Sequence, residues 1–284
     1  MNAERGFQNV VSVKNLDSLQ YLWLTPIGAV FFHALYSILK CRLAPKIYSR
    51  LSTSSDSSEA PLSLTAEVSE KLVSSTYAIV CSVASIVILW QARNDMLRGQ
   101  APILVPFTYF IMWYFVYDLY AMYDSYCLRM SLRGSFLKKA TTFCRTNIAI
   151  VAHHVVILLI GVPLDIMYVW RKDLGDFIIG CFMIHDMANP FLHTTHILKL
   201  LNQTNSKVFQ MCAVMTVCSF AVFRLLTYPF MIAVYTYQYD LSTLQALSTM
   251  KVHCHAFFWS ALALQVHWFY GIIRVYRKHL QKKD

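Results

Sequence analysis

Seven long apolar stretches dominate the chain and restrict what it can fold into. A helix that crosses a bilayer needs about 20 mostly apolar residues. Of the 284 residues, 57% are hydrophobic and only 14% are charged, whereas soluble domains carry about 25% charged residues. These values exclude an ordinary soluble fold and predict an all-α, polytopic transmembrane helix bundle of about seven spans. The predicted spans are residues 21–39, 72–90, 101–122, 147–164, 177–198, 208–235 and 252–276.

The distribution of Lys and Arg between these spans sets the expected orientation. With the N-terminus outside, the inside segments hold seventeen of the 25 basic residues and the outside segments hold seven. Cytosolic loops are enriched in Lys and Arg, so we predict that the C-terminus is cytosolic. The net charge of +10 is then a topology signal, and we expect no nucleic-acid partner.

The polar segments around the spans divide the chain into five parts. The N-terminus lacks the pattern of a removable signal peptide, and a Ser- and Thr-rich stretch before the second span is typical of partial disorder. The predicted parts are a polar N-terminal segment (1–20), a first transmembrane helix (21–40), a partly disordered cytosolic loop (41–71), the main transmembrane domain (72–276) and a basic cytosolic tail (277–284).

One region fits the seven-span pattern less well than the rest. Gly161, Pro163 and Asp165 lie close together at the end of the fourth predicted span. Glycine and proline interrupt regular helices, and proline also removes a backbone donor. We therefore expect the helix pattern to be least regular in residues 160–176.

Ionisable side chains inside the predicted spans are the most informative residues. Each costs roughly 2.5–3.5 kcal/mol on insertion scales, which makes an idle role expensive. At 1.5 Å of rise per residue, we place several of them between the cytosolic third and the midplane, and we expect them to line a polar cavity open to the cytosol. They are Asp118, His153, His154, His185, Asp186, His193 and His196, and the polar Asn189 falls on the same stripe of the fifth predicted span as His185 and His196.

These residue types favour acyl transfer or hydrolysis on a lipid. A neutral imidazole acts as a general base or attacks an acyl group directly, so we expect His153 or His154 to react. Asp186 or Asp118 would orient the reacting ring, and His185 would assist proton transfer. A structural ion pair between Asp118 and Arg224 is the alternative reading of those two residues.

Metal binding is the competing chemistry for so many histidines. The chain has His153–His154, His193-Thr-Thr-His196 and His253-Cys-His255, and none of these reproduces the repeated HxxxH and HxxHH boxes of membrane desaturases. The sequence also lacks HExxH, GxSxG and a Gly-rich phosphate loop. We therefore expect no metal and no cofactor.

The order of these motifs resembles the TLC-domain superfamily, which includes the ceramide synthases. Their signature is a His-His pair, a short loop and a His-Asp pair followed by a further Asp. Here His153–His154 is followed after 30 residues by His185–Asp186, and Asn189 stands where the further Asp is usual. Other stretches are similar to the TLC-domain-containing protein 3 group, although the Ser of its Glu-x-Ser-x-Pro pattern is missing. These stretches are residues 114–122, 175–181, 189–191 and 223–230.

The resemblance implies N-acylation of a sphingoid base by fatty acyl-CoA to give ceramide, in the endoplasmic reticulum, with the Golgi as the alternative. Acyl-CoA is then a co-substrate, membrane lipids are partners, and a homo- or hetero-oligomer is left open. A non-catalytic regulator or binder of membrane lipids is the alternative function. The expected catalytic residues are His153, His154, His185, Asp186 and Asp118, with substrate contacts from Asn189, His193 and Arg224.

Overall fold

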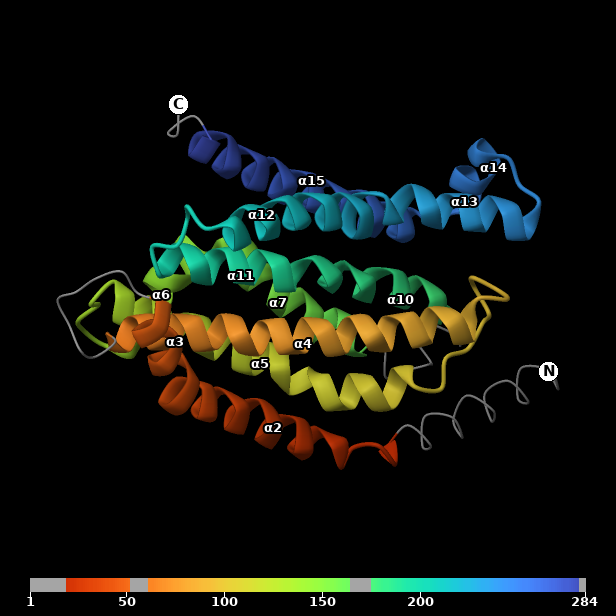
Figure 1. The fold of residues 1–284 in the computed structure, drawn as a ribbon. Helices are drawn as coiled ribbons and strands as arrows, with labels where there is room; N and C mark the ends of the chain where they lie inside the picture. Colours follow the sequence, from red (N-terminus) through yellow and green to blue (C-terminus); the bar gives the residue numbers. More distant parts are fainter. Residues whose placement is uncertain (1–18, 52–60, 164–174, 281–284) are drawn as a thin grey trace. The chain divides into compact units, whose positions relative to one another are not determined.

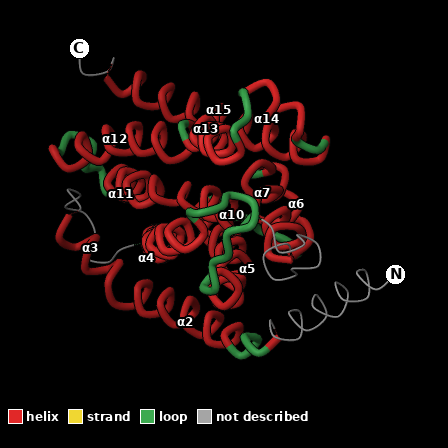
Figure 2. Tube along the Cα trace, turned by 90° about the vertical axis from the view of Figure 1, so that its right-hand side faces the viewer, coloured by secondary structure: helices red, strands yellow, loops and turns green. Residues whose placement is uncertain are grey.

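The structure is a computed structural model that describes residues 19–51, 61–163 and 175–280. Within these ranges every regular element is helical (Figure 1 and Figure 2). The α-helices are α2 (Leu24–Ile38), α3 (Ala44–Leu51), α4 (Leu62–Ala92), α5 (Leu104–Arg129), α6 (Phe136–Thr146), α7 (Ile148–Val156), α10 (Asp176–Met183), α11 (Asn189–Leu200), α12 (Lys207–Phe220), α13 (Thr227–Tyr239), α14 (Thr243–Thr249) and α15 (Val252–Leu280).

Four shorter helical turns depart from α-helical geometry and join these helices. Three are π-helical, with i to i+5 hydrogen bonds, and one is a tighter 3₁₀ turn. They are the π turns η1 (Leu39–Leu43), η2 (Ile157–Gly161) and η4 (Ala221–Leu225), and the 3₁₀ turn η3 (Ile184–Ala188).

The helices confirm a multi-pass, all-α membrane protein. In the described residues, four helical stretches are long and apolar enough to cross a membrane. The bent pair of α6 with the helix that follows it would make a fifth. The predicted count of about seven spans stays a prediction. The four stretches are Leu24–Arg50, Leu62–Ala92, Lys207–Tyr239 and Val252–Arg277.

Some expectations fall outside the described residues, and one boundary differs. The N-terminal segment to residue 18, most of the Ser- and Thr-rich stretch, residues 164–174 of the irregular region and the last four residues are not described. Helix α4 begins at Leu62, ten residues before the expected start of the second span. Because α3 also fills residues 44–51, the segment expected to be a loop is helical at both ends.

The chain forms two compact units. Helices α4 and α11 each contribute residues to both units. Unit 1 is made of Met1–Tyr77, Pro102–Leu174 and His196–Gln203, and unit 2 of Ala78–Ala101, Gly175–Thr195 and Thr204–Asp284.

In unit 1, helix α2 packs against α5 (Figure 1). Gly28 allows the close approach, because a Cβ atom at this position would overlap the backbone carbonyl of Phe110. Next to this contact, Phe32 of α2 is 2% exposed and lies against Tyr114 of α5, with ring centroids 5.3 Å apart. Tyr114 in turn stacks on Tyr77 of α4 at 3.6 Å. An aromatic core therefore joins α2, α4 and α5.

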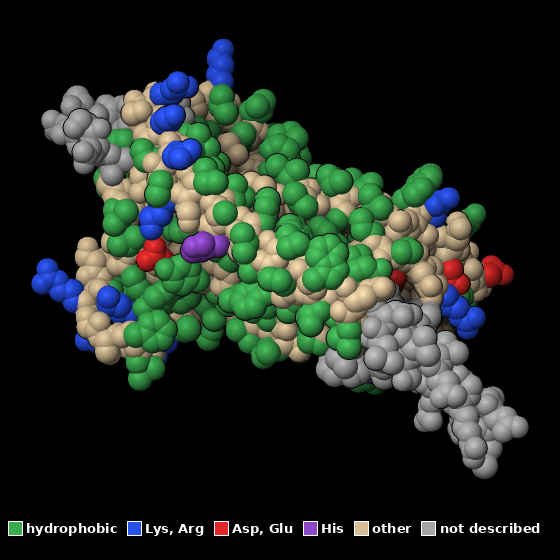
Figure 3. All heavy atoms as spheres, turned by 90° about the horizontal axis from the view of Figure 1, so that it is seen from below, with side chains coloured by type: hydrophobic (Ala, Val, Ile, Leu, Met, Phe, Trp, Pro, Cys, Tyr) green, Lys and Arg blue, Asp and Glu red, His purple; other side chains and the backbone are tan. Residues whose placement is uncertain are grey.

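The outer surface of α2 is apolar. Trp23, Ile27 and Val30 are 59%, 47% and 69% exposed, and hydrophobic side chains cover much of the α2 face of unit 1 (Figure 3). Soluble proteins rarely expose large contiguous apolar patches, whereas such a surface is stable against lipid chains. This exposure agrees with α2 as a membrane helix.

In unit 2, α4 and α10 meet at a small residue. Gly180 of α10 lies against Ile88 and Leu89 of α4, where an added Cβ would come within 3.0–3.1 Å of their side chains. Its carbonyl accepts a hydrogen bond from Ser85 Oγ at 2.8 Å. Such serine bonds satisfy polar groups where no water is present, and they hold the two helices together.

The loop after α4 in unit 2 is held by one carboxylate. Asp95 accepts hydrogen bonds from the Tyr239 hydroxyl and from the backbone N–H groups of Leu97 and Arg98. All three donors stabilise the ionised form, the Tyr239 hydroxyl most of all, so they hold the pKa of Asp95 below its ordinary value.

We expect Gly28→Ala to destabilise the protein, because its Cβ would meet the backbone of Phe110. Overpacking of this kind costs about 1–3 kcal/mol. Gly271→Ala in α15 is the matched control, since an added Cβ there meets nothing within 4 Å and alanine has the better helix propensity. Unfolding in detergent measures both variants, and equal stability of Gly28→Ala and wild type would contradict the packing described above.

We expect Asp95→Asn to remove a pH-dependent part of the stability. Because the folded pKa of Asp95 is lowered, its contribution is complete above the ordinary carboxyl pKa of about 4 and is lost as the pH falls through the folded value. Melting curves from neutral to acidic pH should show wild type more stable than the variant at neutral pH, with the difference shrinking in acid. A difference that grows in acid would refute this reading.

Candidate functional site

The first polar cluster of unit 1 centres on a buried imidazole–carboxylate pair. His154 of α7 and Asp118 of α5 join through Nε2 and Oδ2 at 2.9 Å, and each side chain is 7% exposed. The second carboxylate oxygen of Asp118 accepts a hydrogen bond from Ser74 Oγ of α4 at 2.8 Å. Both oxygens are therefore satisfied, as a buried charge requires.

Both ring nitrogens of His154 have an acceptor as partner. Nδ1 lies 2.9 Å from the carbonyl oxygen of Ile150, and Nε2 lies 2.9 Å from the carboxylate of Asp118. The ring is therefore held on both sides, by its own helix and by α5.

His153 lies next to this pair. Its ring makes an edge-to-face contact with the ring of His154, with centroids 5.7 Å apart, and its side chain is only partly buried. On a helix, adjacent side chains point about 100° apart. The two histidines therefore have different surroundings, and His154 is the one that the Asp118 carboxylate holds.

Two buried glutamates extend the cluster along α4. Glu70 is 3% exposed and pairs with Lys71 at 2.7 Å. Glu67 is 6% exposed, and its Oε1 lies 3.2 Å from Arg129 Nη1 and 2.9 Å from His196 Nε2. Each of these carboxylates has a basic partner, which lowers the cost of burying it.

The hydropathy pattern did not indicate this part of the cluster. We expected Glu67, Glu70 and Lys71 in the loop before the second span, whereas they lie inside α4. The signal was present in the spacing: Glu67, Glu70 and Ser74 recur at i, i+3 and i+7, which places them on one side of a helix.

The polar cluster of unit 2 centres on Arg224, which is 9% exposed. Its Nε donates to the carbonyl oxygen of His185 at 2.9 Å, its Nη1 to Gln265 Oε1 at 3.1 Å and its Nη2 to Asn189 Oδ1 at 2.7 Å. Asp186 Oδ1 lies 3.9 Å from Nη2. A guanidinium offers five donors in a plane, and this arrangement joins η3, α15 and η4.

Two irregular turns make these contacts available. In η3, the N–H of Asn189 bonds to the carbonyl of Asp186 rather than to that of His185, as it would in an α-helix. The His185 carbonyl is therefore left for Arg224. Pro190 follows directly and has no N–H of its own. Arg224 itself lies in the π turn η4, and π turns are frequent at functional sites.

Asn189 joins Arg224 to Asp186. Its Oδ1 accepts from Arg224 and its Nδ2 donates to Asp186 Oδ1 at 2.7 Å. An amide offers both a donor and an acceptor, whereas an ionised aspartate only accepts. Asn189 thus bridges an acid and a base, and an aspartate here would face Asp186 with like charge.

The remaining predicted residues of unit 2 lie near this cluster in the chain. The His185 side chain is 7% exposed, and its ring packs against the rings of Phe182 and Tyr228, with centroids 5.6 and 5.7 Å apart. His193 lies on α11 and is partly buried. The catalytic role of His185 and the substrate-binding role of His193 stay predictions.

The structure thus groups the predicted residues into two sets. Asp118, His153 and His154 come together in unit 1, and His185, Asp186, Asn189 and Arg224 in unit 2. From the sequence, Asp118 and Arg224 were a possible ion pair. In the structure, Asp118 contacts His154 and Ser74, whereas Arg224 contacts His185, Gln265 and Asn189. A common cytosolic cavity stays a prediction.

One hollow lies at the surface of unit 1, and none of the predicted site residues lines it. Its lining residues are Tyr123, Asp124, Cys127, Leu128, Ser131, Leu132 and Lys139.

The described part of the chain contains no candidate metal site. Among those residues, no three His, Cys, Asp or Glu side chains are grouped so that they could hold an ion. The clusters above are instead built from pairs of acids and bases, which suits proton transfer and the stabilisation of charge.

Comparison with known proteins identifies one family. A family model described as a TLC domain matches residues 67–274, where the sequence predicted a domain at 72–276. The match covers both polar clusters and begins at Glu67, the first buried carboxylate of α4. No solved structure matches the chain.

We expect Asp118→Ala to cost about 3–5 kcal/mol of stability, because removing one partner leaves His154 buried without its counter-charge. Asp124→Ala is the matched control on the same helix. Asp124 pairs with Lys40 at 3.4 Å and is 31% exposed, so its removal should cost less than about 1 kcal/mol. Unfolding in detergent measures both losses, and a loss for Asp118→Ala no larger than for the control would argue against the buried pair.

Proposed function

The chain belongs to the TLC-domain family, which makes it a membrane protein of lipid biology, and from this premise we propose that it is an N-acyltransferase. In this proposal it transfers the fatty acyl group of acyl-CoA to the amine of a sphingoid base and forms a ceramide. The observation that carries the proposal is the adjacent pair His153–His154, of which one ring is bound to a buried carboxylate.

The hydrogen bonds of His154 divide the roles of the two histidines. Both of its ring nitrogens are engaged, one by Ile150 and one by Asp118. A ring held in this way is suited to positioning and to storing a proton rather than to attacking a substrate. We assign proton abstraction to His153. The His154 ring, which Asp118 holds, packs edge-to-face against the His153 ring with centroids 5.7 Å apart and helps to position it.

The proposed reaction balances without a metal or a redox cofactor. The substrate amine attacks the thioester carbonyl, a C–N bond forms and the C–S bond breaks. His153 takes the proton that the amine loses and returns it to the departing CoA thiolate. The products are an amide and free CoA, so the imidazole ends in its starting state.

The cluster of unit 2 supplies candidates for lipid recognition. Arg224 holds a positive charge in a buried position, and Asn189 and Asp186 surround it with polar atoms. We propose that Arg224, Asn189 and His193 contact polar groups of a lipid. The catalytic roles expected for His185 and Asp186 remain proposals of the same rank.

The use of acyl-CoA also bears on the membrane in which the protein resides. Acyl-CoA is available in the cytosol, and the excess of Lys and Arg in alternate loops favours a cytosolic C-terminus. We propose the endoplasmic reticulum as the membrane of residence, with the Golgi as the alternative.

A non-catalytic lipid binder is the second candidate, and one observation favours it. The side chains of Asp118 and His154 are each only 7% exposed. Such a closed pair also suits a structural element of a protein that binds or regulates membrane lipids.

The decisive measurement uses purified full-length protein in detergent, sphinganine and a labelled fatty acyl-CoA. We expect labelled N-acyl sphinganine from wild type and a loss of about 10²-fold or more for His153→Ala, the size of a general-base contribution. His267→Ala, an exposed histidine of α15, should keep full activity. Melting curves establish that each variant is folded.

The two candidates give different outcomes in this assay. Wild-type protein that forms no product, under conditions where an authentic ceramide synthase works, supports the lipid binder. Product formation that His153→Ala leaves unchanged would remove His153 from the mechanism while keeping the enzyme.

A further inference from the structure

Helix α6 lies across the direction of the helix that follows it. The axis turns by 96° between Phe136–Thr146 and Ile148–Gly161, and both segments belong to unit 1. Eleven residues of α-helix are about 16 Å long, too short to cross the hydrocarbon core of about 30 Å. Because the second segment lies in a predicted span, this length and angle are typical of a helix that lies along the membrane surface.

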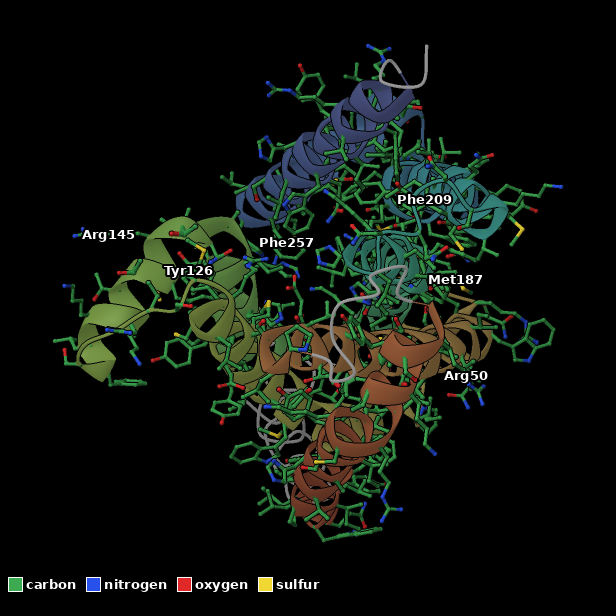
Figure 4. The ribbon with its side chains drawn as sticks, turned by 60° about the vertical axis from the view of Figure 1, so that its left-hand side comes forward. Arg50, Tyr126, Arg145, Met187, Phe209 and Phe257 are labelled. Atoms are coloured by element: carbon green, nitrogen blue, oxygen red, sulfur yellow. The ribbon has the colours of Figure 1, made fainter. Side chains whose placement is uncertain are left out.

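One side of α6 is fixed to α5. Phe143 is 5% exposed and lies against the rings of Tyr123 and Tyr126, with centroids 5.8 and 5.6 Å apart. The Tyr126 hydroxyl donates to Thr146 Oγ1 at 3.1 Å, and Figure 4 shows Tyr126 beside α6. These contacts hold α6 in place and decide which of its side chains point outward.

The outward side chains are of two kinds. Phe136 and Leu137 are 74% and 75% exposed, which is unusual for large apolar residues. Lys138 and Arg145 are exposed beside them, and Arg145 projects away from the bundle of unit 1 in Figure 4. Apolar side chains next to basic ones on a short surface helix are typical of helices that lie in the membrane interface.

Basic residues outnumber acidic ones in the part of the sequence around α6. No Asp or Glu occurs from residue 125 to residue 164. Arg129 pairs with Glu67, but among the described residues no ion pair involves the four other basic side chains of this region. They are Arg133, Lys138, Lys139 and Arg145.

We propose that α6 and the turn before it form a binding surface for anionic phospholipid headgroups. Phe136 and Leu137 enter the headgroup boundary, and Arg133, Lys138, Lys139 and Arg145 bind phosphate and carboxylate groups of the lipids. A membrane meets both kinds of side chain at once, whereas a soluble acidic partner would satisfy only the charges. The excess of Lys and Arg also predicts that α6 faces the cytosolic leaflet, where anionic lipids are concentrated. The proposal goes beyond the acyltransferase and does not depend on it.

The test compares two nanodisc compositions, phosphatidylcholine alone and phosphatidylcholine with phosphatidylserine, each holding the full-length protein. Hydrogen exchange of residues 136–146, followed by mass spectrometry, is the readout. Each basic residue near an anionic surface contributes roughly fivefold in binding, so we expect exchange to slow by about tenfold or more when phosphatidylserine is present. High salt should remove the difference, because it screens the charges.

Two charge variants make the test specific. In Lys138→Gln/Lys139→Gln/Arg145→Gln protein, we expect the response to phosphatidylserine to be lost. Arg98→Gln/Lys207→Gln/Lys251→Gln protein removes the same charge from exposed positions elsewhere and should respond like wild type. The wild-type comparison needs neither variant, so it decides the proposal even if a variant fails to fold.

Three results would overturn the proposal. The first is equal exchange of residues 136–146 in both nanodiscs. The second is loss of the response in the control variant as well, which would show a net-charge effect. The third is slower exchange with an added long-chain acyl-CoA in phosphatidylcholine nanodiscs but not with phosphatidylserine, which would assign the cations to the CoA phosphates.

Discussion

The requirement that every buried charge has a partner of opposite sign governs this structure. An ionisable side chain inside hydrocarbon costs several kcal/mol unless it is paired and hydrogen-bonded. In unit 1, Asp118 is bound by His154 and Ser74, Glu70 by Lys71, and Glu67 by Arg129 and His196. These pairs tie α4, α5, α7 and the end of α11 together, so the polar residues that suggest chemistry also determine how the helices pack.

The irregular turns serve the same requirement in unit 2. In a regular helix each interior carbonyl already accepts an N–H of the same helix. The 3₁₀ turn η3 leaves the carbonyl of His185 available, and Arg224 in the π turn η4 binds it. Asn189 completes the cluster by accepting from Arg224 and donating to Asp186. The amide of Asn189 therefore contacts both the positive charge of Arg224 and the negative charge of Asp186.

Much of the fold and part of the site follow from the sequence, for physical reasons that particular residues illustrate. The long apolar runs predict membrane helices, and the cost of burying charge singles out Asp118, His154 and Arg224. The sequence pattern did not indicate Glu67 or Glu70, because a hydropathy pattern ends a span at its first charges, whereas α4 continues through them. The sequence also left Arg224 as a possible partner of Asp118, because it does not show which of several basic groups approaches a given acid.

The sequence by itself determined the class of the protein, because apolar length, charge asymmetry and motif order are properties of the chain. It also predicted that imidazoles and carboxylates lie inside the apolar helices. Only the tertiary structure decided which atoms meet. In the structure, both ring nitrogens of His154 are engaged, a carbonyl of η3 binds Arg224, and α6 turns by 96° and presents its cations outward. These features depend on contacts between helices. Such contacts are set by packing in three dimensions rather than by any local pattern of residues.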